Sequence, residues 1–504
     1  MQLNELKVID YLEMIKNREI TVEQVIKDIF HRIDRIDKTL KAYLFVNKEG
    51  ALLEAKKIDQ KIKNNQDIPP LAGLPIAIKD IICTKDMETT CASRILKGFI
   101  PPYDATVVRR IKDAGGIIIG KTNLDEFAMG SSTENSAFQV TLNPWDITRV
   151  PGGSSGGSAV AVAADEALIG LGTDTGGSVR LPASFCGIVG IKPTYGRISR
   201  YGVISYASSL DQIGILGKGI KDVAKLMNVI CGYDSLDSTS ANLSVPDFQS
   251  SCREGISDLK FGVPREFFSH GLDGEVKRKI MDAIHKLSRL GAKIEETSLP
   301  NIEYALPAYY LIAMAEASSN LAKFDGVQYG LRIEESDDLE DMYLKTRSKG
   351  FGAEVIRRIM LGTYALSSGY YDAYYLKAQR ARTLIKKDFD NVFQKYDLLI
   401  CPTSPIPPFK VGERIDDPLT MFLTDAYTLP VNLAGLPGLS MNCGFTDKGK
   451  LPVGIQIIGR AFEEEKMLRV AYNLEEELKE INSVKPDLSF NLSIPNNCKQ
   501  GKIL

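Results

Sequence analysis

The sequence predicts an α/β fold, with one large α/β/α domain in which a mixed central β-sheet is flanked by helices. Two observations support this prediction. Short apolar runs that are typical of buried strands recur along the chain, and segments with the three- and four-residue spacing of helices separate them. The 504 residues are 44% hydrophobic and 25% charged, which is ordinary for a globular protein with a substantial core.

Residues 1–65 are predicted to form an N-terminal helical segment that packs on this core. Thr21, with Glu23 and Gln24 after it, is typical of a helix start. Apolar residues follow helical spacing before and after this point, at Val8, Tyr11, Leu12, Ile15, Val25, Ile26, Ile29, Ile33 and Ile36.

Residues 66–485 are predicted to form the α/β/α domain itself. Strands are expected at 74–82, 117–119, 167–171, 187–191, 398–400 and 453–458, with a mainly helical region over 275–395. The polar stretch 234–251 could connect the two strand-rich parts, but it contains no long flexible tract that would mark a domain boundary. Residues 486–504 are expected to form a polar C-terminal tail.

Charge and cysteine content narrow the classes of function. The chain has 62 basic and 64 acidic residues, a net charge of -2, so it lacks the basic footprint of a nucleic-acid or membrane-surface protein. Its eight cysteines include no Cys-x-x-Cys pair, which favours reduced thiols over a zinc knuckle or a redox pair. Residues 1–7 do not show the basic-then-apolar pattern that is typical of a secretory signal, and no run approaches the ~20 apolar residues of a membrane span. We therefore expect a cytoplasmic protein without a membrane partner.

The segment from Gly115 to Thr122 matches the P-loop pattern, but we do not expect it to bind phosphate. A P-loop needs small, flexible residues between its glycines, so that backbone N–H groups can wrap the phosphate. Here residues 116–119 are Gly-Ile-Ile-Ile, a β-branched run that favours a strand. Lys121 and Thr122 are then residues that leave this strand.

Residues 152–156, Gly-Gly-Ser-Ser-Gly, match the nucleophile elbow of serine hydrolases. That elbow needs an apolar strand before it and an acid and a histidine after it. Residues 146–151 make a poor strand, and the downstream histidines, His270 and His285, lie in polar contexts. His31 is predicted to lie on a helix face. A Ser-His-Asp triad is therefore the less favoured alternative.

Two glycine-serine segments, residues 151–158 and 172–178, offer another route to an activated serine. Each is flanked by strongly apolar sequence, whereas flexible linkers sit among polar residues. Glycines beside core elements usually mark a close backbone approach. Residues 175–178 also offer successive backbone N–H groups without bulky side chains, as an oxyanion hole requires.

Lys79 lies within the apolar run 74–82, and two roles are open to it. It can be an edge lysine whose ammonium reaches water. It can also be buried, and burial lowers the pKa of a lysine so that its neutral amine can act as a base near pH 7. The two serine segments favour the second role, and together they predict a Ser-Ser-Lys relay.

The order of these motifs resembles that of the amidase signature family, from about Gly73 to Leu210. The strand with its lysine is followed by Gly-Gly-Ser-Ser-Gly-Gly-Ser and by Gly-Thr-Asp-Thr-Gly-Gly-Ser-x-Arg-x-Pro-Ala. The resemblance implies that Ser178 is the nucleophile, that Ser154, after a cis peptide bond, is a bridging serine, and that Lys79 is the base. It also implies an oxyanion hole formed by the backbone N–H groups of Thr175, Gly176, Gly177 and Ser178.

Other segments resemble one branch of that family, the glutamine-hydrolysing subunits of tRNA-dependent amidotransferases. These segments are residues 125–132, 308–310, 316–321, 351–359 and 367–372. The resemblance implies that Arg358 binds the α-carboxylate of glutamine, that Asp425 binds its α-amino group, and that Tyr309 belongs to the same site. An arginine fork suits a carboxylate well.

This branch implies that the chain hydrolyses glutamine and supplies ammonia to convert Glu-tRNA(Gln), or Asp-tRNA(Asn), to the amidated form. It implies a heterotrimer with B and C subunits, in which the misacylated tRNA is reached through the B subunit. ATP and Mg²⁺ are expected in the B subunit, with no cofactor and no metal in this chain. A free-standing amidase that acts on a small or aryl amide is the alternative, and a non-catalytic scaffold is the third hypothesis.

Overall fold

The computed structural model describes residues 2–269 and 271–489, and it contains one mixed sheet of eleven strands. The strand order is β1-β3-β2-β4-β6-β5-β10-β11-β9-β7-β8. The strands are β1 (Tyr43–Val46), β2 (Pro75–Lys79), β3 (Ile117–Thr122), β4 (Ile169–Asp174), β5 (Val189–Lys192), β6 (Gln212–Gly217), β7 (Lys260–Pro264), β8 (Lys293–Thr297), β9 (Leu398–Pro402), β10 (Gly438–Phe445) and β11 (Pro452–Gly459). The pairs β3–β2, β2–β4, β9–β7 and β7–β8 are parallel, and the remaining neighbours are antiparallel.

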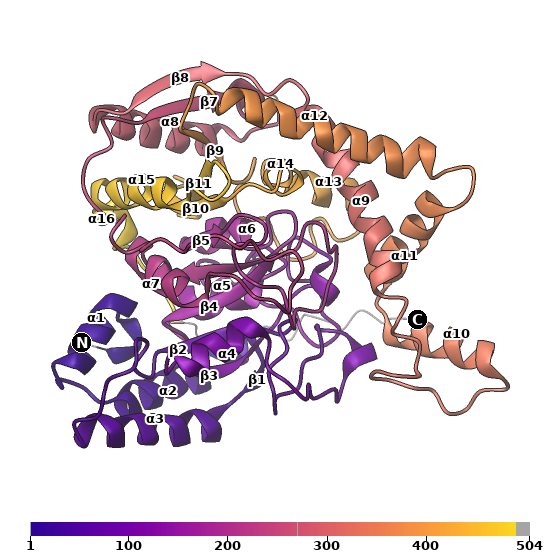
Figure 1. Ribbon diagram of the computed structural model, residues 1–504, viewed down its shortest axis with the longest axis horizontal. Helices are drawn as coiled ribbons and strands as arrows, with labels where there is room; N and C mark the ends of the chain where they lie inside the picture. Colours follow the sequence, from indigo (N-terminus) through magenta and orange to yellow (C-terminus); the bar gives the residue numbers. More distant parts are fainter. Residues whose placement is uncertain (1, 270, 490–504) are drawn as a thin grey trace.

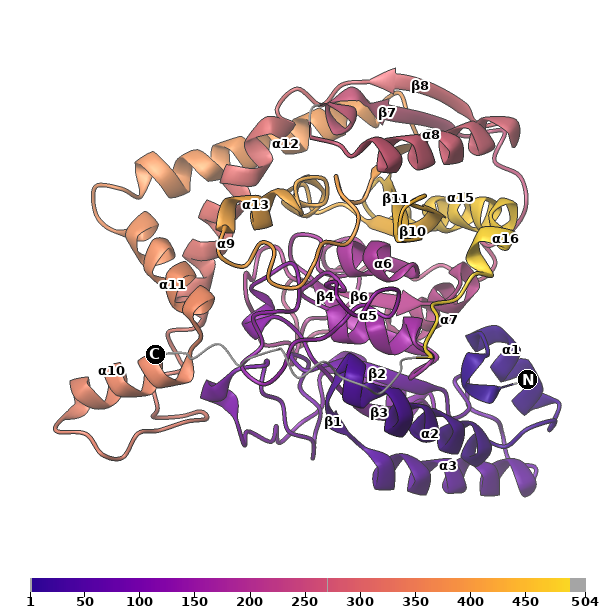
Figure 2. The same ribbon diagram turned by 180° about the vertical axis from the view of Figure 1, so that it is seen from behind.

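Helices flank this sheet along its whole width (Figures 1 and 2). They are α1 (Val8–Lys16), α2 (Val22–Leu40), α3 (Lys48–Lys63), α4 (Thr106–Asp113), α5 (Gly156–Ala163), α6 (Arg180–Cys186), α7 (Ile220–Ile230), α8 (Gly274–Arg289), α9 (Ala305–Asn320), α10 (Leu339–Gly350), α11 (Ala353–Leu366), α12 (Lys377–Val392), α13 (Pro418–Leu423), α14 (Leu429–Leu433), α15 (Glu464–Glu477) and α16 (Lys479–Asn482). Helices α5 and α6 pack on the middle strands, while α9, α10 and α11 project to one side in both views. The predicted fold class is confirmed.

The central strands bring together the segments that the sequence singled out. Strands β2 and β4 are parallel neighbours, with Ile78 opposite Leu171. Their carboxyl ends therefore meet at one edge of the sheet, where β2 ends at Lys79 and β4 ends at Asp174. Both strands are buried along their whole length. This register places the lysine beside the loop that leads to α6.

The N-terminal segment is more than a set of helices. Thr21 caps α2 in a capping box, because its hydroxyl accepts from the Gln24 N–H and the Gln24 side chain accepts from the Thr21 N–H. Between α2 and α3, however, β1 pairs with β3 and forms the edge of the sheet. Helical spacing did not predict this strand, because it is short and only partly buried.

The P-loop look-alike is strand β3, as predicted. Its residues are fully buried, and Lys121 is still within the strand rather than beyond it. The Lys121 ammonium lies 3.1 Å from Asp80 Oδ1 and donates to the Ile82 carbonyl and the Thr89 hydroxyl. These contacts are those of a structural buried ion pair, and they leave the ammonium directed into the protein.

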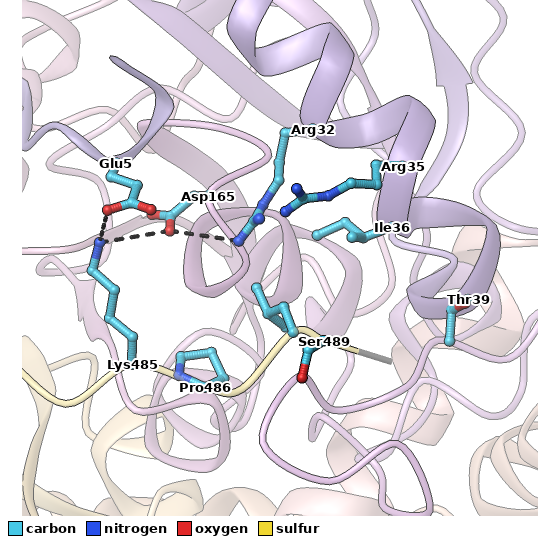
Figure 3. A pocket seen from close by; sticks show the side chains of 10 residues that line it. Glu5, Arg32, Arg35, Ile36, Thr39, Asp165, Lys485, Pro486 and Ser489 are labelled. Atoms are coloured by element: carbon cyan, nitrogen blue, oxygen red, sulfur yellow. Dashed lines mark hydrogen bonds and ion pairs between the residues drawn. The ribbon is translucent and has the colours of Figure 1, made fainter. Parts of the chain in front are cut away.

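The C-terminal segment returns to the N-terminal helices. The side chain of Lys485 lies 2.7 Å from Glu5 Oε2 and 3.9 Å from Asp165 Oδ2, and Asp165 also faces Arg32 (Figure 3). A cavity of about 460 Å³ lies between this segment and α2, lined by Glu5, Arg32, Arg35, Ile36, Thr39, Asp165, Lys485, Pro486, Leu488 and Ser489. Most of the predicted tail, residues 490–504, lies outside the described residues.

Packing of α2 on the core depends on Gly73, which leads to a testable prediction. Gly73 has a φ of +80°, and an added Cβ would lie 2.4 Å from Val22 Cγ1 at the start of α2. We expect Gly73→Ala to lower the free energy of unfolding by about 2–4 kcal/mol, through left-handed strain and overpacking together. Urea unfolding measures this change.

The matched control is Gly98→Ala. Gly98 has a similar φ of +82°, but no heavy atom lies within 4 Å of its added Cβ. This variant should lose only the backbone contribution, about 1–2 kcal/mol. Equal losses in the two variants would contradict tight packing between Gly73 and α2.

Candidate functional site

The candidate site lies where β2 and β4 end, and Lys79 is at its centre. The Lys79 ammonium lies 2.7 Å from Ser154 Oγ, 2.9 Å from Ser155 Oγ and 2.9 Å from Thr173 Oγ1. Ser154 and Ser155 belong to the first glycine-serine segment, just before α5, while Thr173 is in β4. Three segments that are far apart in the sequence therefore meet at this amine.

Burial determines the charge of Lys79. Its side chain has no exposed surface, and loss of hydration lowers its pKa from 10.5 to about 7. Asp125, Asp174 and Asp211 oppose this shift through their charges. Near neutral pH a large fraction of Lys79 is therefore the neutral amine, which has a lone pair and can accept a proton. The edge-lysine alternative is wrong, because the amine does not reach water.

The two serines differ in access. Ser154 is fully buried, and the Gly153–Ser154 peptide bond is cis, as the family resemblance implies. Ser178 is 8% exposed, and its carbonyl accepts from the Ser155 N–H at 3.1 Å, which joins the two segments. Within the described residues the Ser178 hydroxyl takes part in no hydrogen bond. It is thus the serine that is both accessible and free to react.

The loop after β4 is organised by the carboxylate of Asp174. This carboxylate accepts from the N–H groups of Gly177, Val179 and Arg180 at the start of α6. The Gly177 N–H, which the sequence placed in the oxyanion hole, is therefore already engaged at 2.8 Å. The N–H groups of Thr175, Gly176 and Ser178 have no hydrogen-bond partner in the part of the chain that the structure describes.

Glycine is required in this loop because other elements approach it closely. An added Cβ on Gly177, whose φ is +132°, would lie 2.1 Å from Thr428 Oγ1. One on Gly176 would lie 2.7 Å from the Tyr309 hydroxyl. The Thr428 hydroxyl also donates to the Gly176 carbonyl at 2.6 Å. The loop is thus held between its own strand and α9 and α14.

Arg180 completes the support of this loop from inside the protein. It is fully buried, and its guanidinium forms a bidentate pair with Asp174, with both nitrogen–oxygen distances at 3.0 Å. It also donates to Gln456 Oε1 on β11 at 2.6 Å and to the Asn432 side chain on α14. Burial alone would raise the pKa of the Asp174 carboxyl, but the charge and hydrogen bonds of Arg180 hold it well below its usual range.

Arg358 lies on the inner face of α11 and is only 3% exposed. Its Nε donates to Glu354 Oε1 at 2.7 Å, and its Nη1 donates to the Tyr206 hydroxyl at 2.8 Å. The guanidinium also faces the rings of Tyr206, Tyr310 and Phe422 at 5.4–5.5 Å. This setting fixes the direction of a planar cation that can bind a carboxylate.

Asp425 lies just after α13 and is a candidate partner for an ammonium group. Its Oδ2 accepts from the Ser131 hydroxyl, while its Oδ1 is buried and has no partner among the described residues. Burial raises the pKa of this carboxyl to about 8, and the Ser131 hydroxyl and the charge of Arg358 oppose the shift. A bound ammonium would satisfy Oδ1 and favour the ionised form.

Tyr309 of α9 joins these residues to the reacting loop. It is 4% exposed, it meets the ring of Tyr310 edge-on at 5.0 Å, and its hydroxyl lies against Gly176. The Tyr310 ring in turn stacks on Phe422 at 3.8 Å. The structure therefore brings all the residues chosen from the sequence to one region, through α9, α11 and the segment that follows α13.

Several residues that support the site were not predicted from the sequence. Asp125 accepts from the N–H groups of Thr133 and Asn135 and packs against Gly153. Asp174 and Arg180 stand inside the recognised motif, but no role was assigned to them. An acidic or basic residue within an otherwise apolar, glycine-rich segment was the available signal, because buried charges are nearly always paired.

The histidine alternative is not supported by the structure. His31 and His285 are exposed on α2 and α8, whereas Ser154 is fully buried. His270 lies outside the described residues. In residues 2–269 and 271–489, no group of three or more His, Cys, Asp or Glu side chains is arranged to hold a metal ion.

Comparison with known proteins gives one family. The Amidase family model matches residues 24–468. The A subunit of glutamyl-tRNA(Gln) amidotransferase from Desulforamulus reducens is 55% identical over 97% of this chain and 100% of its own length. The protein of the same name from Carboxydothermus hydrogenoformans is 56% identical over the same shares.

Solved structures agree with these matches. The crystal structure of the A subunit of glutamyl-tRNA(Gln) amidotransferase from Thermotoga maritima has a TM-score of 0.79 and 45% identity, over 94% of this chain and 95% of that chain. A peptide amidase from Stenotrophomonas maltophilia has a TM-score of 0.80 at 28% identity, over 96% of this chain and 99% of that chain.

The buried ion pair beneath the loop gives a stability prediction. Arg180→Met leaves the Asp174 carboxylate buried without its cation, and we expect a loss of about 3–5 kcal/mol in the free energy of unfolding. Denaturant unfolding measures this loss. The matched control is the double variant Asp174→Asn/Arg180→Met, which removes both charges and should recover part of the stability. A single variant as stable as the parent would contradict this account.

Proposed function

Because this chain belongs to the amidase family, we propose that it is the glutamine-hydrolysing subunit of a tRNA-dependent amidotransferase. The observation that carries the proposal is the buried amine of Lys79 in contact with Ser154, beside the accessible Ser178. Relatives that are A subunits of glutamyl-tRNA(Gln) amidotransferases match almost the full length of the chain at 55–56% identity. Together these findings favour glutamine as the amide donor.

The reaction begins with proton transfer from serine to lysine. Neutral Lys79 takes a proton from the Ser154 hydroxyl, which takes one from the Ser178 hydroxyl. This step needs the Ser178 hydroxyl to turn toward Ser154, and catalytic hydrogen bonds often tighten only when substrate binds. Ser178 Oγ then attacks the side-chain amide carbon of glutamine.

The resulting oxyanion is stabilised by backbone N–H groups. Those of Thr175, Gly176 and Ser178 are the available donors, since the Gly177 N–H is engaged by Asp174. Collapse of the intermediate breaks the carbon–nitrogen bond, and the proton held by Ser154 and Lys79 returns to the leaving nitrogen as ammonia forms. Water then hydrolyses the acyl-enzyme and releases glutamate.

The two charged groups of glutamine select this substrate over simple amides. The Arg358 guanidinium would bind the α-carboxylate, and the free Oδ1 of Asp425 would bind the α-ammonium. Tyr309 would lie between them and the reacting loop, because its hydroxyl lies against Gly176. The family resemblance implies these roles, and the charges of Arg358 and Asp425 and the burial of all three side chains support them.

The proposed function includes partner subunits that receive the ammonia. Ammonia would pass to B and C subunits in a heterotrimer, where ATP and Mg²⁺ would activate the misacylated tRNA on the B subunit. The relatives are themselves named as subunits, which supports a multi-subunit enzyme. A cytoplasmic location is supported by the seven cysteines of the described residues, which are all free and buried. Among those residues, no helix is long and apolar enough to cross a membrane.

The pKa of Lys79 predicts a pH dependence. Burial lowers this pKa to about 7, so the amine is neutral above that pH and protonated below it. We expect kcat for glutamine hydrolysis to fall about tenfold for each pH unit below about 6.5, because only the neutral amine accepts a proton. Steady-state rates from about pH 5.5 to about pH 9 measure this limb.

Two variants test the proposed relay of Lys79, Ser154 and Ser178. Lys79→Arg keeps a cation that cannot lose its proton, so it should be inactive at every pH. Ser178→Ala should remove glutamine hydrolysis while leaving the thermal unfolding midpoint nearly unchanged. Near-normal turnover in either variant would exclude the proposed relay.

The glutamine-binding roles predict a change in substrate preference. We expect Arg358→Ala to raise KM for glutamine by about 100-fold, because a buried, charge-assisted hydrogen-bond pair is lost. Hydrolysis of butyramide, which lacks both charged groups, should change little. Arg357→Ala is the matched control, since that neighbouring side chain is 44% exposed. If Arg358→Ala left KM for glutamine unchanged, the protein would instead be a free-standing amidase for small or aryl amides.

A further inference from the structure

Asp211 forms hydrogen bonds both with the oxyanion-binding loop, at Thr175, and with the segment of Tyr206, which contacts Arg358. It directly precedes β6, whose first residue Gln212 is opposite Asp174 in the antiparallel pairing with β4. This register places Asp211 beside the loop that begins at Thr175. The side chain is 4% exposed, and both of its oxygens accept hydrogen bonds.

One oxygen of Asp211 holds the reacting loop. The Thr175 hydroxyl donates to Asp211 Oδ1 at 2.6 Å. The backbone N–H of Thr175 is one of the three available oxyanion donors, and the other two belong to Gly176 and Ser178 in the same loop. An anchored Thr175 side chain limits rotation of these N–H groups, and oxyanion stabilisation depends on such fixed donors.

The other oxygen of Asp211 binds the backbone at Tyr206, the residue that contacts Arg358. The backbone N–H groups of Tyr206 and Ala207 donate to Asp211 Oδ2 at 3.0 and 3.1 Å. The Tyr206 hydroxyl accepts from Arg358 Nη1 at 2.8 Å, and its ring lies 5.5 Å from the guanidinium carbon. Asp211 therefore fixes the backbone of Tyr206, and the hydroxyl of Tyr206 accepts the hydrogen bond from Arg358.

We propose that Asp211 is a positioning residue that couples recognition of the substrate carboxylate to the oxyanion-binding loop. The inference rests on the proposed function, since it takes Arg358 as the carboxylate site. Among the described residues Asp211 forms no hydrogen bond with Ser178 or Lys79; its charge favours the protonated form of Lys79, but its hydrogen bonds act through Thr175 and Tyr206. A carboxylate suits this role because both oxygens only accept hydrogen bonds, so it can hold donors on two sides.

Three single variants separate the two arms of this coupling. Thr175→Val removes the hydroxyl and should lower kcat about tenfold for both glutamine and butyramide, with KM within about twofold. Tyr206→Phe should raise KM for glutamine about tenfold and leave butyramide hydrolysis unchanged. Asp211→Asn keeps one accepting oxygen but places an NH2 group, which only donates, on the other side, so it cannot accept on both sides and should show both changes at once.

A combined variant distinguishes positioning from general stability. If Asp211 acts through these two neighbours, adding Asp211→Asn to Thr175→Val/Tyr206→Phe should change kcat and KM by less than about twofold. A further loss of about tenfold in that background would overturn the inference. So would Thr175→Val and Tyr206→Phe variants that keep parental kcat and KM for glutamine.

The test uses the full chain with its partner subunits, and circular dichroism reports whether each variant folds. If Asp211→Asn does not fold, the Thr175→Val and Tyr206→Phe variants still decide the matter, because each arm predicts its own kinetic change. A parent enzyme that hydrolyses butyramide but not glutamine would defeat the proposed function. A parent that hydrolyses glutamine, with variants that do not follow this partition, would defeat only the inference.

Discussion

The buried pair of Asp174 and Arg180 is the interaction on which the site depends. Asp174 ends β4, and its carboxylate receives the N–H groups that begin α6. Arg180 neutralises this charge and extends to Gln456 on β11, across the middle of the sheet. Two buried charges are costly unless they are paired and hydrogen-bonded, and here the two groups bind each other and further side chains. The loop that presents Ser178 therefore has a fixed shape before any substrate arrives.

Strand order explains why the remaining groups meet at that loop. Strands β2 and β4 run parallel, so the lysine at the end of one lies beside the loop at the end of the other. The antiparallel partner β6 brings Asp211 to the same edge from the opposite direction. Helices α9 and α11 then add Tyr309 and Arg358 from the side. The sheet is thus the rigid support, and the reacting groups lie on its loops.

Buried charged groups of the same residue type have different roles in this protein, because their surroundings differ. Burial lowers the pKa of Lys79, and the side chains that contact its amine are hydroxyl groups, with no carboxylate in direct contact to offset that burial. Lys121 is equally buried, yet it is paired directly with Asp80 and serves the structure. Among the acids, Asp174 keeps its charge through Arg180, while burial of Asp425 favours its neutral form. Environment rather than residue type sets these roles.

Resemblance to the amidase signature family implied the roles of Ser154 and Ser178. The sequence by itself determined the α/β class and the strand nature of the P-loop look-alike, and it predicted a site at Lys79 and the two glycine-serine segments. These follow from local patterns, since apolar spacing and glycine-rich segments reflect the backbone around each residue. Strand β1, the engagement of the Gly177 N–H by Asp174, and the links made by Asp211 were decided only by tertiary structure. Hydrogen-bond partners and pKa values depend on atoms that are distant in sequence, and no local pattern records which of them will meet.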